Sequence, residues 1–180
     1  KKEGKSTKEI SRSHKVLVSD NNLITITGGK WTTHRRMAQD TIDKAIALGL
    51  LPKAKCQTYN YKVHGWRPNP NLDDHMYVYG SDQDAILALA KENIAFGEKL
   101  SEKFDYTVAE VVWAVREEMA RNVDDVLARR VRMLYVDARE ASAVAPKVAA
   151  VMAAELGKDQ KWIDEQVAAF QEIASHYYLD

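Results

Sequence analysis

The sequence is poor in residues that cross-link a chain or break its secondary structure: it has one cysteine, four prolines and eight glycines among 180 residues. The single cysteine, Cys56, excludes an intramolecular disulfide and is typical of a reducing compartment. No apolar run approaches the ~18 residues of a membrane span, and the basic N-terminus lacks the apolar segment of a signal peptide. With 46% hydrophobic and 29% charged residues, the composition predicts a cytoplasmic, soluble, helix-rich protein.

The motifs of several site classes are also missing. The five histidines show no HxxxH or HExxH spacing, and one cysteine cannot complete a cysteine-rich zinc site, so we expect no metal. Neither GxSxG nor the GxGxxG fingerprint of dinucleotide-binding folds occurs. Three arginines are interspersed with Leu127 and Val131, which is typical of the solvated face of a helix; they are Arg129, Arg130 and Arg132. Since no aromatic residues are interleaved with these arginines, we expect no nucleic-acid partner.

The formal net charge is zero, but the charges are unevenly distributed along the chain. Residues 1–36 hold nine Lys and Arg against three Asp and Glu, a net charge of +6. The remainder holds 17 basic and 23 acidic residues, a net charge of −6. This asymmetry indicates that an anion is handled near the N-terminus, although the lysines up to Lys8 are typical of a flexible tail.

The first fifty residues predict a hairpin followed by a helix. Two β-rich runs, 14–18 and 23–27, flank a polar turn, which is a good hairpin signal. A helical pattern then begins at Thr32 or Thr33 and is stopped by Gly49.

Residues 50–80 differ in character from the segments on either side. They combine tyrosines, glycines and prolines without a periodic pattern and indicate a linker with at most one short strand. We therefore predict two domains, residues 1–52 and residues 53–180.

Beyond the linker the pattern is helical. Thr107 with Glu110, and Asp137 with Glu140, have the spacing of capping boxes that open helices. The predicted fold class is mainly α: a C-terminal bundle of about five helices, preceded by a β-hairpin plus one helix. The five helical segments are 81–93, 107–119, 123–135, 137–157 and 159–178.

One segment combines the features of an anion site. The second strand ends in two glycines, which permit positive φ and a close approach of the backbone to a ligand. A helix starts within a few residues and presents unpaired N–H groups with a partial positive charge. Lys30, Arg35 and Arg36 add full charges around the same turn. An ordinary glycine turn capped by a threonine, with the basic residues in water, explains the segment equally well.

The same segment resembles a known family. Arg12, followed after the hairpin by the run Thr-Gly-Gly-Lys-Trp-Thr-Thr-His-Arg at 27–35, looks like the end of the catalytic domain of FAD-dependent glycerol-3-phosphate dehydrogenases and glycerophosphate oxidases. That family carries Gly-Gly-Lys-hydrophobic-Thr-Thr-Tyr-Arg at this point, so His34 departs from it. Residues 110–130 are similar to the family's C-terminal helical domain, and the resemblance covers most of residues 11–156.

The resemblance implies a role for each matched position. Arg12 would grip the substrate phosphate, and Lys30 would bind substrate oxygens beside the flavin. The backbone near the isoalloxazine ring would come from Gly28, Gly29, Trp31 and Thr32.

The resemblance also implies an activity. The whole enzyme would oxidise sn-glycerol 3-phosphate to dihydroxyacetone phosphate by hydride transfer to FAD and pass the electrons to quinone. Electron transfer to oxygen would instead make it an oxidase, and the sequence does not separate the two. We identify no catalytic base, because His14 and His34 are candidates on proximity alone. The enzyme would be peripheral on the inner membrane face, with a homodimer left open.

The sequence begins Lys1-Lys2-Glu3 and its first methionine is Met37, so we interpret the chain as processed or as a fragment. Without a glycine fingerprint for the pyrophosphate, we do not expect this chain alone to bind FAD or to be active. The alternative is a non-catalytic helical interaction module in which the Gly-Gly-Lys turn is purely structural.

Overall fold

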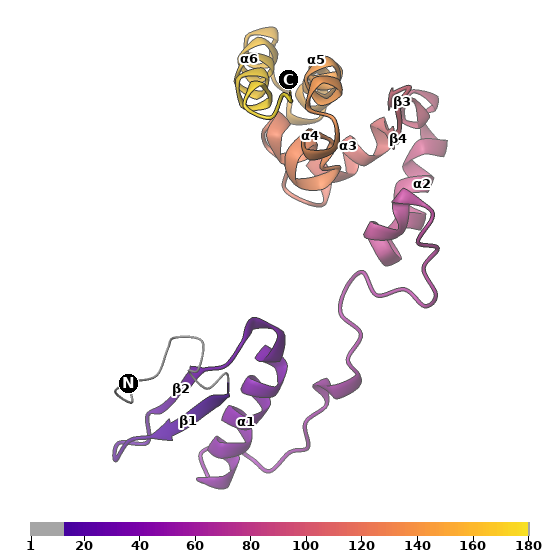
Figure 1. Ribbon diagram of the computed structural model, residues 1–180. Helices are drawn as coiled ribbons and strands as arrows, with labels where there is room; N and C mark the ends of the chain where they lie inside the picture. The colour runs from indigo at the N-terminus through magenta and orange to yellow at the C-terminus, as the bar shows by residue number, and fades with distance from the viewer. Residues whose placement is uncertain (1–12, 180) are drawn as a thin grey trace. The chain divides into compact units, whose positions relative to one another are not determined.

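The computed structural model describes residues 13–179, which form two units that divide between Val63 and His64 (Figure 1). Residues 51–63 are exposed throughout and are counted with the first unit. The boundary that we predicted after residue 52 lies at the start of this exposed stretch and stays a prediction.

The first unit contains the predicted hairpin and helix. Strand β1 (His14–Val18) pairs antiparallel with β2 (Ile24–Gly28), with Val16 opposite Ile26. A 3-10 turn (Trp31–Thr33) leads directly into helix α1 (His34–Ala47). Both elements confirm the sequence prediction.

The second unit opens with irregular chain and 3-10 turns. A single 3-10 turn at Thr58–Asn60 precedes it, and residues His75–Asp82 form two 3-10 turns that meet at Gly80. The short strand that we allowed in the linker is therefore wrong. The reason is local capping: the Asp74 carboxylate accepts a hydrogen bond from the Met76 N–H at 2.9 Å and starts a turn there.

The remainder of the second unit is mainly α, as predicted. Arg132 adopts the left-handed conformation with φ of 58° and interrupts the helix that we predicted over 123–135. A π-helix, Asp125–Arg130, precedes this residue. The α-helices are α2 (Gln83–Glu92), α3 (Val108–Arg116), α4 (Met133–Val136), α5 (Ala138–Leu156) and α6 (Gln160–Ser175).

A second hairpin, which the sequence did not predict, lies between α2 and α3. Its strands, β3 (Lys99–Ser101) and β4 (Phe104–Thr107), are too short to show an alternating pattern. The hairpin also changes how α5 is capped. The Asp137 carboxylate accepts from the Glu140 N–H at 2.9 Å, but the Glu140 carboxylate accepts from the Ser101 hydroxyl, so the predicted capping box is only half formed.

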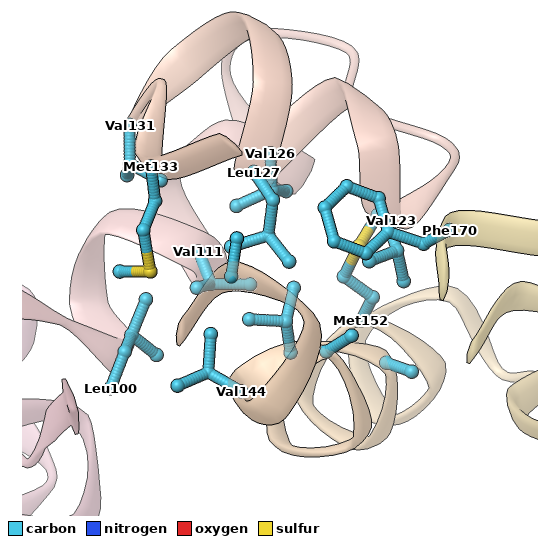
Figure 2. Close-up of a cluster of buried hydrophobic side chains, with 14 of the residues drawn as sticks. Leu100, Val111, Val123, Val126, Leu127, Val131, Met133, Val144, Met152 and Phe170 are labelled. Carbon is cyan, nitrogen blue, oxygen red and sulfur yellow. The ribbon is translucent and has the colours of Figure 1, made fainter. Parts of the chain in front are cut away.

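One hydrophobic core holds the second unit together (Figure 2). Side chains from α3, the π-helix, α5 and α6 point toward one another, and Leu127, Met152 and Phe170 are fully buried. Trp113 and Trp162 pack against buried clusters, whereas Trp66 is 47% exposed. The core fixes the π-helix relative to α3 and α5.

Candidate functional site

The Gly-Gly-Lys turn links β2 to α1 and requires both of its glycines. Gly28 and Gly29 have φ of 78° and 82°, in the left-handed region that favours glycine. A Cβ at Gly28 would lie 2.9 Å from the Ser13 carbonyl oxygen, and one at Gly29 would lie 2.5 Å from the Met37 sulfur. The backbone conformation and the close contacts within this unit thus explain why both positions are glycine. Their approach to a flavin ring stays a prediction.

The start of the helix is built by a threonine, as the sequence indicated. The Lys30 N–H donates to Thr33 Oγ1 at 3.2 Å, and the Thr33 hydroxyl donates back to the Lys30 carbonyl at 2.9 Å. The backbone N–H groups of Trp31 and Thr32 donate to no group within residues 13–179. Two donors at a helix start that are unpaired among the described residues favour a negatively charged partner.

Of the three cations predicted around the turn, two contact other side chains of the first unit. Arg36 Nε lies 3.0 Å from Asp40, and Arg35 donates to Gln39 at 2.9 Å while its guanidinium lies over the Tyr59 ring. The exposed Lys30 ammonium has no ion-pair partner in the part of the chain that the structure describes. Lys30 is therefore the cation of this turn whose charged group has no partner among residues 13–179.

The structure describes three of the four other side chains that we considered for the site. Arg12 lies outside the described residues. The Trp31 side chain is 87% exposed and stacks on the His34 ring with centroids 5.6 Å apart. His34 Nδ1 contacts the Trp31 carbonyl at 2.9 Å, and His14 Nε2 contacts the Asp40 carboxylate at 2.8 Å. Neither histidine is thereby identified as a catalytic base.

A buried carboxylate in the second unit was not recognised as a site from the sequence. Glu110, whose side chain is 0% exposed, accepts from the Thr107 N–H at 2.7 Å and so completes the predicted capping box of α3. It also accepts from the Tyr79 hydroxyl at 3.1 Å and contacts His75 Nε2 at 3.2 Å. The capping pattern identified Glu110 as the residue that caps α3. Nothing in the sequence linked it to Tyr79 and His75, which lie 31 and 35 positions earlier.

The Glu110 network shifts the titration of its neighbours. The hydrogen bond to Glu110 raises the pKa of His75, and burial opposes that shift. Burial raises the pKa of Tyr79 strongly, and the Glu110 charge adds to the effect. The tyrosine is therefore a neutral donor at physiological pH, and His75 favours its charged form.

His75→Gln is expected to destabilise the protein more in acid than in alkali. The pKa of His75 is higher in the folded chain than in the unfolded chain, so its stabilisation is fully present below the unfolded pKa of about 6.5 and is lost as the pH rises through the folded pKa. We expect a loss of about 1.5–3 kcal/mol near pH 5.5, falling toward zero near pH 9, in urea denaturation followed by circular dichroism. His64→Gln, at an exposed His64–Asp82 pair, is the control and should change little at either pH. An equal loss at both pH values for His75→Gln would contradict the charged pair.

Two site classes have no representative among the described residues. Within residues 13–179, no group of three His, Cys, Asp or Glu side chains could hold a metal ion. In the same range, no helix is both long and apolar enough to cross a membrane.

Residues 22–163 match the family described as the C-terminal domain of alpha-glycerophosphate oxidase. The match includes the Gly-Gly-Lys turn and the Glu110 network, and Arg12 precedes it. No solved structure matches the chain.

Among curated proteins, the chain is similar to mitochondrial glycerol-3-phosphate dehydrogenases. It is 32% identical to the one from Arabidopsis thaliana over 88% of this chain, and 32% identical to the one from Mesocricetus auratus over 95% of this chain. It is 31% identical to a probable mitochondrial glycerol-3-phosphate dehydrogenase of Dictyostelium discoideum over 90% of this chain. The alignments span only 29%, 26% and 27% of these relatives, respectively.

Proposed function

The chain belongs to the family of the C-terminal domain of alpha-glycerophosphate oxidase, and from this premise we propose that it forms the C-terminal part of a flavoenzyme. The enzyme oxidises sn-glycerol 3-phosphate to dihydroxyacetone phosphate with FAD as the hydride acceptor. The observation that carries the proposal is the family match, which extends through the Gly-Gly-Lys turn into the helical unit. The relatives are named as glycerol-3-phosphate dehydrogenases, which supports the same substrate.

The geometry of the turn fits an electron-rich partner. Lys30 has no carboxylate partner among the described residues, and the N–H groups of Trp31 and Thr32 are unpaired there. These donors suit the pyrimidine edge of a flavin, where reduction increases negative charge. We therefore assign the backbone of residues 28–32 to the flavin and the Lys30 ammonium to the substrate.

When bound, the flavin would accept the hydride from C2 of glycerol 3-phosphate. In this chain, Lys30 would hold a substrate oxygen and orient the reacting carbon, and Arg12 would bind the phosphate through its planar guanidinium. The helix start would stabilise the charge that develops beside Trp31 and Thr32. The group that removes the hydroxyl proton is assigned to no residue of this chain.

Quinone is the proposed electron acceptor, and the proposed location of the enzyme is peripheral on the inner membrane face. The family description names an oxidase whereas the relatives are named dehydrogenases, so the two acceptors have to be compared directly. Oxygen consumption below a tenth of the quinone-coupled rate would support the quinone, whereas stoichiometric peroxide would overturn it.

In the complete enzyme, Lys30→Ala is expected to lower kcat and Arg12→Ala to raise KM for glycerol 3-phosphate. Each loses a charge-assisted contact of about 1.5–3 kcal/mol, which corresponds to roughly a ten- to hundredfold loss of kcat/KM. Dye-coupled steady-state kinetics measure both. Lys15→Ala, at an exposed lysine of β1, is the matched control and should leave kcat and KM unchanged. Wild-type kinetics for both variants would show that the site is assigned wrongly.

The alternative of a non-catalytic helical interaction module has less support. It accounts for the core of the second unit, but it assigns no role to the N–H groups of the Gly-Gly-Lys turn that are unpaired within residues 13–179. Retention of full activity by an enzyme lacking residues 1–52 of this chain would favour the module.

A further inference from the structure

A cavity of about 400 Å³ lies in the second unit, beside the Glu110 network. A volume of this size suits a small organic ligand. Its polar wall comes from the 3-10 turns, β4 and the chain around the π-helix, through His75, Tyr79, Tyr106, Arg129, Arg130 and Arg132.

The backbone on the arginine side of the cavity has two uncommon conformations. The π-helix Asp125–Arg130 supplies Arg129 and Arg130, and Arg132 has φ of 58°. π-helices recur at functional sites, and a non-glycine residue held in the left-handed region is strained. Both features place guanidinium groups at the same cavity.

The three guanidinium groups keep donors available. Arg129 is paired with Asp124 and Asp125 through Nη1, so its Nε and Nη2 have no partner within residues 13–179. Arg130 donates through Nε and Nη2 to Glu118, which leaves Nη1. The exposed Arg132 guanidinium makes no ion pair with any described residue.

The acidic residues of the cavity are already engaged. Glu110 is held by its four donors, from Thr107, Tyr79 and His75, and Glu118 is paired with Arg130 at 2.8 Å. An incoming anion therefore meets paired carboxylates and unused N–H donors.

The remaining wall is aromatic and apolar. The Tyr106 ring lies edge-on to the His75 ring, with centroids 5.3 Å apart, and its hydroxyl makes no hydrogen bond to a described residue. Burial raises the pKa of Tyr106, so this hydroxyl is a donor at neutral pH. Val78 and Val136 add exposed apolar surface to the cavity.

We propose that this cavity binds a small phosphate monoester, with Arg132 as its principal anchor, Arg129, Arg130 and the Tyr106 hydroxyl as further donors, and the valines against the organic part. Three guanidinium groups at one cavity suit a dianion better than a monocarboxylate, because planar N–H pairs match phosphate oxygens. The site consists of residues 75–136 and does not depend on the Gly-Gly-Lys turn or on the proposed oxidation.

The test uses the 180-residue chain and phenyl phosphate, whose phosphate is mainly dianionic at neutral pH and whose ring suits the apolar wall. Isothermal titration calorimetry at constant ionic strength should show saturable one-to-one binding, with weaker binding of inorganic phosphate. Arg132→Asn should weaken phenyl phosphate binding by about tenfold or more, because a charge-assisted contact is lost. Asparagine tolerates the left-handed conformation, so this variant should keep the fold.

Lys158→Gln is the charge-matched control. Lys158 is exposed and follows the far end of α5, a helix of about 28 Å that begins next to the cavity. This variant should bind phenyl phosphate like the wild type. No saturable binding to the wild type, or equal affinity in Arg132→Asn and the wild type, would overturn the proposal. If Arg132→Asn fails to fold by circular dichroism, Tyr106→Phe replaces it: several-fold weaker binding supports the site, and unchanged affinity overturns it.

Discussion

Glu110→Ala is expected to destabilise the protein by about 3–5 kcal/mol, since a buried carboxylate with a charged partner is lost. The Glu110 side chain is completely buried, and its removal leaves the Tyr79 hydroxyl, the His75 ring, and the N–H and hydroxyl of Thr107 without their acceptor. The loss would also remove the capping box at the start of α3, a helix that is buried along most of its length. A loss of this size is a large fraction of the stability of a small domain.

The measurement is urea denaturation of the full chain, followed by circular dichroism at neutral pH. Glu102→Ala is the control, because Glu102 lies in the turn of the same hairpin region but is exposed; its effect should stay within about 0.5 kcal/mol. A loss below about 1 kcal/mol for Glu110→Ala, with an unchanged dependence of the unfolding free energy on urea concentration, would mean that the four donors find other acceptors. In that case Glu110 would not hold residues 75–79 in place.

The elements that could be predicted from the sequence are those specified by local patterns. The hairpin at 14–28 follows from two β-rich runs around a polar turn, and the starts of α3 and α5 follow from Thr107 and Asp137. The break at residues 28–29 follows from the two glycines, since only glycine adopts their φ without strain. Each of these signals lies within a few residues of the element that it specifies.

The features that could not be predicted depend on contacts between distant residues. The 3-10 turns at His75–Asp82 dock onto Glu110, and the β3–β4 hairpin takes the Glu140 carboxylate away from its own helix start. The three arginines at 129–132 have the spacing of a solvated helix face. The chain instead forms a π-helix and turns at Arg132, which directs these residues to one cavity. Periodicity describes a regular helix, so it cannot anticipate such a turn.

The largest effect of all is expected from cutting the chain after residue 52. Residues 53–180 should fold alone, because both hydrophobic clusters of the structure are formed by residues between Met76 and Ala174. Residues 1–52 should not fold alone. In the described part of that segment, Ala45 is the single buried hydrophobic residue, while Leu17, Leu23 and Ile42 remain exposed.

Circular dichroism and thermal melting of the two pieces test whether each folds independently. The piece 53–180 should be helical and melt cooperatively, with a midpoint close to that of the whole chain, whereas the piece 1–52 should show no cooperative transition or should aggregate. A third piece, 64–180, is the matched control for the boundary: since residues 53–63 are exposed throughout, its midpoint should equal that of 53–180. If the whole chain melts cooperatively but 53–180 does not, the hairpin and α1 contribute to the same folding unit as the helices. The boundary after residue 52 would then have to be abandoned, and with it the interpretation of the first unit as the end of a separate flavin-binding domain.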